Sequence, residues 1–199
     1  MKNTIDRESA IALLQKYVRS KTVYFHSIES EAIMRNVAQK LQATHPDENI
    51  DIDLWAITAL LHDLDSELTT EDLARHGVET VELLQKEGYE IPEMFQAILS
   101  HTEALGFSEI KRTTKMDYAL AASENMTGII SAYVKMRPTK KIDGLKAKSI
   151  TKKIKDRSFA ASVNREFIND VDKHLGLDRS EFVTLSIDAM TEIADQIGM

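Results

Sequence analysis

His62 and Asp63 are adjacent at the end of an apolar run, residues 54–61, whose composition favours a buried helix. If the helix continues, Asp63 lies on the same face as Ala56 and Ala59. A carboxylate on a buried face is costly unless a cation pairs with it. A neutral imidazole beside a carboxylate is a natural pair of ligands for a divalent metal. The dipeptide therefore predicts a metal-binding position where packing alone favours an apolar residue.

Four of the six histidines fall in or at the ends of successive expected helices. They are His26, His62, His76 and His101. The interior of a helical bundle can bring such positions together from facing helices. The chain has no cysteine, so a bound metal would be held by imidazole and carboxylate. Those ligands suit Mn, Fe, Co, Ni, Zn or Mg.

A second carboxylate also falls on an apolar helix face. Glu124 shares one face of the helix expected over residues 114–136 with Ala121 and Gly128. Small neighbours would let a ligand or another backbone approach closely. Glu124 is therefore a candidate ligand, and the alternative is a partly exposed Glu at a seam between helices.

The composition predicts an all-α protein, because glycine and proline are scarce and helical periodicity continues along most of the chain. Five helices are expected over about residues 6–18, 52–65, 114–136, 160–175 and 179–197. Another should begin at Ser27 or Ser30 and end before Pro46. Two more should begin near residues 69–72, ending at Gly88, and at Pro92. No stretch is apolar over the ~18 residues of a membrane span. The N-terminus lacks the apolar core of a signal peptide, so a cytoplasmic location is expected.

Charge is distributed unevenly along the chain. The formal net charge is -7, yet residues 135–157 contain ten Lys or Arg and two Asp. This basic segment could attract an anion, or it could be a solvated surface. No aromatic platform accompanies it, and the acidic remainder would repel a polyanion, which argues against nucleic acid as the partner.

The histidines, the His-Asp pair and the later acid together resemble the HD superfamily of metal-dependent phosphohydrolases. The family pattern is a His, a His-Asp pair at a helix end, often two further His, and an acid on a later helix. The matching residues here are His26, His62, Asp63, His76, His101 and Glu124. The family usually has Asp at the last position, so Glu124 is a departure from it. Other runs, such as 136–138 and 163–166, look like a bacterial subgroup of stand-alone HD-domain proteins.

The resemblance implies an HD-type helical bundle with a C-terminal helical extension. The whole chain, 1–199, would form one domain, with a metal-binding core over about 20–135 and a basic connector and C-terminal helices over 136–199. It also implies a divalent metal, as one or two ions, and a small phosphorylated substrate such as a nucleotide.

The resemblance also suggests roles for individual residues. His26, His62, Asp63 and Glu124 would bind the first ion, while His76 and His101 would bind a second ion or the phosphate. Asp65 and Glu67 are candidates, with Asp63, for catalytic acids that orient or deprotonate water. The candidates for substrate-binding cations are Arg112, Arg137, Lys140 and Lys141.

Two other functions stay open at this point. The HD scaffold also resembles mixed-valent di-iron oxygenases, for which the same six residues would just suffice as ligands. Alternatively, the chain could be a non-catalytic helical module for signalling or nucleic-acid binding. The last helix carries apolar positions at helical spacing, including Phe182 and Ala189, that could serve a homodimer, but burial within one chain is the better explanation.

Overall fold

Helices make up the secondary structure of this chain, as seen in a computed structural model that describes residues 1–105 and 109–199. The longer helices are α1 (Arg7–Tyr17), α2 (Lys21–Thr44), α3 (Ile52–Leu61), α4 (Val78–Lys86), α5 (Pro92–His101), α6 (Lys115–Met136), α7 (Ala147–Lys155) and α10 (Arg179–Glu192). The shorter ones are η1 (Leu73–Arg75), η2 (Thr102–Leu105), α8 (Arg165–Asn169), α9 (Val171–Leu175) and α11 (Ala194–Ile197). Within the described residues the only β-type pairing is an isolated bridge between Lys2 and Tyr89, which confirms the all-α prediction.

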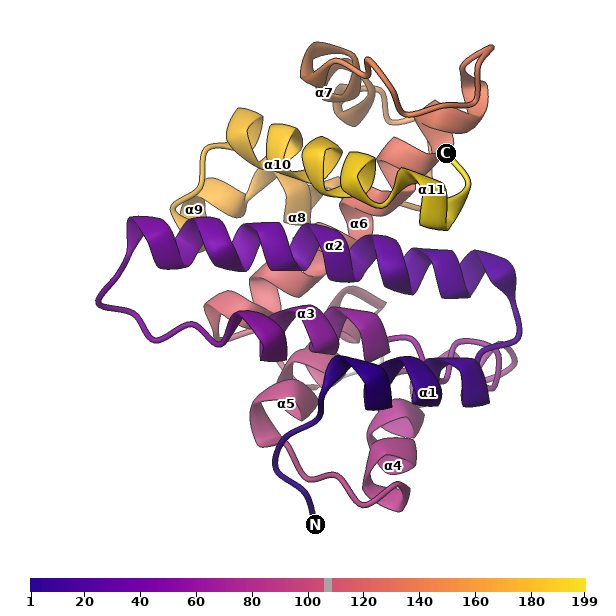
Figure 1. Ribbon diagram of the computed structural model, residues 1–199, viewed down its shortest axis with the longest axis vertical. Helices are drawn as coiled ribbons and strands as arrows, with labels where there is room; N and C mark the ends of the chain where they lie inside the picture. The colour runs from indigo at the N-terminus through magenta and orange to yellow at the C-terminus, as the bar shows by residue number, and fades with distance from the viewer. Residues whose placement is uncertain (106–108) are drawn as a thin grey trace.

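The central element is α2, a helix of 24 residues. It packs against α3 on one side and α10 on the other, while α6 crosses it (Figure 1). Its apolar face includes Ile33, Met34 and Leu41, which are almost fully buried. On the opposite side, Phe182 of α10 is fully buried and joins the C-terminal helices to the same core. The elements that carry the four histidines therefore surround one continuous interior.

Some helix ends differ from the sequence prediction. α2 begins at Lys21, capped by Ser20, and not at Ser27 or Ser30, so His26 lies in its second turn. α3 ends at Leu61, because residues 62–68 continue as turns. The predicted cap at 69–72 is wrong, since α4 starts only after Gly77, whose φ of 81° is unfavourable for other residues.

The C-terminal third also holds more short helices than expected. The basic segment contains α7, which buries Ile150 and Ile154 against the rest of the protein. The helix predicted over 160–175 is divided into α8 and α9, and the one over 179–197 into α10 and α11. In the part of the chain that the structure describes, no helix combines the length and apolar character needed to cross a membrane.

Glu29 is a buried carboxyl on α2, and it makes stability depend on pH. Burial raises its pKa to about 7, although a hydrogen bond from Ser131 (2.9 Å) and the nearby Lys135 oppose the shift. Because the folded protein holds the proton more tightly than the unfolded chain, stability is full below about pH 4.5 and falls as the pH rises towards 7.

We therefore expect Glu29→Gln to stabilise the protein at pH 8 by about 3 kcal/mol, as a shift of that size implies. At pH 4.5 the variant and the wild type should be equally stable. Urea unfolding at both pH values measures the difference, with the exposed Glu8→Gln as the control. If Glu29→Gln changed the stability equally at both pH values, the pKa of Glu29 would not be raised in the folded protein.

Candidate metal centre

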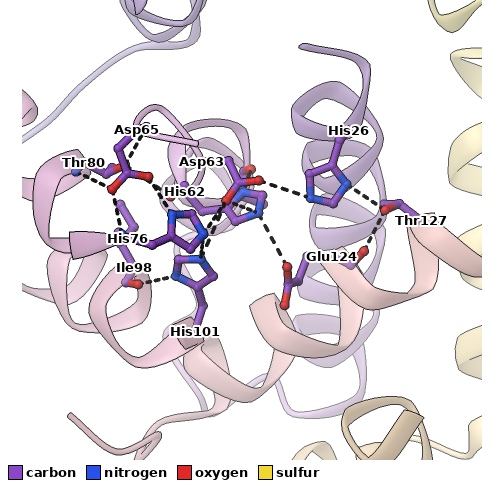
Figure 2. A network of polar contacts seen from close by, with 12 residues as sticks. His26, His62, Asp63, Asp65, His76, Thr80, Ile98, His101, Glu124 and Thr127 are labelled. Atoms are coloured by element: carbon purple, nitrogen blue, oxygen red, sulfur yellow. Dashed lines mark hydrogen bonds and ion pairs between the residues drawn. The ribbon is translucent and has the colours of Figure 1, made fainter. Parts of the chain in front are cut away.

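Asp63 lies in the turn after α3, and imidazoles from four segments surround its carboxylate (Figure 2). Nε2 of His26, from α2, is 3.7 Å from Oδ2 of Asp63. Nε2 of His62, His76 and His101 lies 3.4, 3.3 and 3.7 Å from Oδ1. These three come from the end of α3, the turn after η1 and the end of α5. The structure thus brings all four predicted histidines to one carboxylate.

Two of these imidazoles are oriented by backbone carbonyls. Nδ1 of His62 donates to the carbonyl of Ala59 (2.8 Å), and Nδ1 of His101 donates to the carbonyl of Ile98. A carbonyl only accepts, so the proton of each neutral ring is on Nδ1. The lone pair on Nε2 therefore faces Asp63. Histidines that bind metal typically have this arrangement, in which a hydrogen bond at the other ring nitrogen fixes the orientation of the ring.

His26 is oriented in the same way by a side chain of α6. Its Nδ1 lies 2.9 Å from the hydroxyl oxygen of Thr127. That hydroxyl donates its own proton to the carbonyl of Glu124 (2.6 Å), so it can only accept from His26. The Nε2 lone pair of His26 is again directed at Asp63.

His76 is held by Asp65, whose side chain is fully buried. One oxygen of Asp65 lies 2.7 Å from Nδ1 of His76, and the other accepts from the amides of Gly77 (2.7 Å) and Thr80 (3.0 Å). A Cβ added at Gly77 would lie 3.0 Å from the carbonyl oxygen of Ile98, so the chain passes close to α5 here. Asp65 therefore positions His76 and the start of α4, and both of its oxygens are occupied.

Glu124 completes the cluster from α6. Its Oε2 lies 3.7 Å from Nε2 of His62, and its Oε1 accepts from Asn125 (2.8 Å). Donor atoms of His26, His62 and Glu124 all lie within 4.8 Å of one another, as do those of His62, Asp63 and His101. Glu124 thus lies at the position that the sequence analysis proposed for the second carboxylate.

These donors fit a divalent cation. Two ligands that are each ~2.1 Å from one ion, at ~90–109° to each other, lie about 3.0–3.4 Å apart. The distances from Nε2 to Asp63 are close to this range and are too long for good hydrogen bonds. The Nε2 atom of His62 is buried and has no hydrogen-bond partner among the described residues. A buried polar atom without a partner is costly, and an ion would supply one.

Electrostatics within the cluster favour positive charge. Although burial opposes protonation, Asp63 and Glu124 raise the pKa of His62 to about 9. Burial likewise opposes protonation of His76, but Asp63 and Asp65 raise its pKa to about 10. The histidines around Asp63 hold the pKa of its carboxyl well below the usual range, despite its burial. A metal ion would supply the same positive charge and displace these protons.

Two of the candidate residues, Glu67 and Arg112, form contacts elsewhere in the fold. Glu67 accepts from the backbone amides of Arg19 (2.6 Å) and Ser20 (2.9 Å), so it caps the start of α2. Arg112 has a buried side chain that pairs with Glu103 (3.0 Å) and lies 4.0 Å from the ring centre of Phe167. These contacts join neighbouring elements and leave neither side chain beside Asp63.

The candidate cations of the basic segment have different surroundings. The guanidinium of Arg137 donates to the carbonyls of Lys141 (2.5 Å) and Asp143 (2.9 Å), so it holds its own loop together. Lys141 is exposed. Lys140 lines a cavity of about 580 Å³ that also includes His26. Lys140 therefore shares a cavity with a histidine of the cluster.

Sequence reasoning assigned no role to Thr127, which orients His26. Its position three residues after Glu124 places both on one helix face, and that spacing could have identified it. The roles of the Ala59 and Ile98 carbonyls could not be predicted from residue type, because every residue has a backbone carbonyl. In both cases the carbonyl lies three residues before the histidine that it holds.

The comparisons with known proteins agree with this geometry. A family model described as the HD domain matches residues 23–158, which is more than half of the chain and includes all six residues of the cluster. No curated protein and no solved structure matches the chain. The matched range and the histidine cluster centred on Asp63 show that the chain belongs to the HD domain family.

Proposed function

We propose that this protein is a metal-dependent phosphohydrolase that cleaves a phosphate ester of a small molecule. The observation that carries the proposal is the arrangement around Asp63. Four imidazoles direct Nε2 at one carboxylate, and each is held at Nδ1 by a separate partner. Such outer contacts are typical of histidines that bind metal. Membership of the HD domain family supports hydrolysis as the reaction class.

The residues divide into two groups around the carboxylate of Asp63. His26, His62, Asp63 and Glu124 would hold one divalent ion. His76 and His101 lie beside Oδ1 of Asp63, as His62 does, and would hold a second ion or contact the phosphate. A bound ion of this kind lowers the pKa of coordinated water and polarises the phosphoryl group.

The protein's own groups would then orient the substrate and move protons. The imidazoles of His76 and His101 lie side by side, with their Nε2 atoms 3.2 Å apart. In a site with one ion both would contact the phosphate, and His76, whose pKa is raised to about 10, would donate a proton from Nε2 to a phosphate oxygen or to the leaving oxygen. Asp65 would keep His76 in place for this role, since both of its oxygens are already bonded.

The test is hydrolysis of p-nitrophenyl phosphate by protein that has been stripped with chelator and reloaded with Mn, Fe, Co, Ni, Zn or Mg. We expect elemental analysis to find one or two ions per chain, and phosphate release to require at least one of these metals. If the protein takes up none of them, the proposal is wrong. Binding without phosphate release from any ester in a broad panel would also contradict it.

The convergence of six ligand-type side chains also favours a second candidate, a di-iron oxygenase. Its distinguishing result would be oxygen uptake by the Fe(II)-loaded protein without release of phosphate. The same loaded samples serve for both measurements. Phosphate release with a redox-inactive ion such as Mg or Zn would exclude the oxygenase as the explanation of the site.

A further inference from the structure

A cavity of about 580 Å³ is lined by His26 but not by Asp63. Only His26, among the six cluster residues, lines it. Thr127, which holds Nδ1 of His26, lines it as well. Nε2 of His26 thus faces the metal-binding cluster, and the same ring lines the cavity. A ligand in the cavity would therefore lie next to the metal-binding cluster.

Three lysines from three separate segments line this cavity. Lys21 is in the first turn of α2, Lys135 is in the last turn of α6, and Lys140 is in the loop that follows. In the described part of the chain, none of the three forms an ion pair with a carboxylate within 4.0 Å. Glu29 is the one acidic side chain in the lining, and its hydrogen bond comes from Ser131. Positive charge therefore predominates on the side chains around this space.

The loop that carries Lys140 has a defined conformation. Lys140 has a φ of 50°, a left-handed value that is uncommon for a residue with a side chain. The amide of Lys140 donates to the carbonyl of Arg137 (3.1 Å), and the guanidinium of Arg137 donates to two carbonyls further along the loop. Backbone strain of this kind is found where the surrounding structure holds a residue in place for a role. Arg137 thus positions Lys140 at the cavity.

We propose that this cavity binds a second phosphate group of the substrate, in addition to the phosphate bound at the metal cluster. Lysine is a compact point charge that suits phosphate, and three unpaired lysines suit a group with more than one negative charge. The apolar side chains of Phe25, Val134 and Ile197 also line the cavity and can contact the organic part of the ligand. The substrate class is therefore a small molecule that carries two phosphate groups.

This inference extends the proposed function, and it is tested by binding so that the two can fail separately. The probes are pyrophosphate and inorganic phosphate, titrated by calorimetry into Asp63→Asn protein without metal. The cavity variant is Lys135→Gln/Lys140→Gln. The matched control is Lys148→Gln/Lys152→Gln, which removes two exposed lysines of the same basic segment that do not line the cavity.

We expect pyrophosphate to bind more tightly than phosphate, and the cavity variant to weaken pyrophosphate binding by at least about tenfold. The control should change it by less than about twofold, as distant surface charges are largely screened by salt. Equal losses in the cavity variant and the control, or no loss in the cavity variant, would overturn the inference. Lysine-dependent binding in a protein that hydrolyses no ester would retain the cavity site and reject the phosphohydrolase.

Discussion

Asp63→Asn is expected to weaken metal binding by more than about a hundredfold, since the loss of an outer contact alone costs 10–100-fold. Asp63 is within 3.7 Å of all four imidazoles and contributes an oxygen to each side of the cluster. Asn has nearly the same size, but it removes the negative charge that offsets a divalent ion. Phosphate release should fall to the background level at every metal concentration that supports the wild type.

The measurement is elemental analysis after dialysis against a limiting metal concentration, together with circular dichroism to verify the fold. The matched control is Asp53→Asn, which alters a carboxylate on α3 that is 78% exposed and pairs with Arg35. That control should keep the metal content of the wild type. A folded Asp63→Asn protein that retains its full metal content would show that Asp63 is not a ligand.

The sequence was informative about the site because its ligands belong to residue types that are rare in a buried core. His62, Asp63 and Glu124 all interrupt apolar surroundings, and the structure places them together. Asp63 was expected on a helix face, but α3 ends at Leu61 and Asp63 lies in the following turn. This turn still places the carboxylate of Asp63 in the interior, where it lies beside His26 of α2 and His101 of α5 (Figure 2).

Other features depend on contacts that no local pattern contains. His76 was expected inside a helix, yet it lies in extended backbone after η1, where Asp65 holds it from eleven residues away. The roles of Glu67 and Arg112 likewise depend on partners that are far along the chain or on another element. By contrast, α7 could have been predicted, because Ile150 and Ile154 are four residues apart among lysines.

Asp65→Ala is expected to destabilise the protein by about 2–4 kcal/mol, because two buried amides, those of Gly77 and Thr80, lose their acceptor. His76 would also lose the carboxylate that orients its ring. Any ion held by His76 and His101 should then bind about 10–100-fold more weakly, as is typical when an outer contact is removed. An ion held by His26, His62 and Glu124 should be less affected, since those residues have other partners.

Urea unfolding without metal measures the first effect, and metal titration below the unfolding transition measures the second. The control is Asp72→Ala, an exposed acid whose side chain caps no helix, and it should change stability by less than about 0.5 kcal/mol. Asp65→Asn separates the two effects, because its amide oxygen can still accept from one backbone amide while the charge beside His76 is gone. If Asp65→Asn recovers part of the stability but not the binding of a second ion, the carboxylate acts through His76. Equal recovery of both would mean that Asp65 has only a packing role.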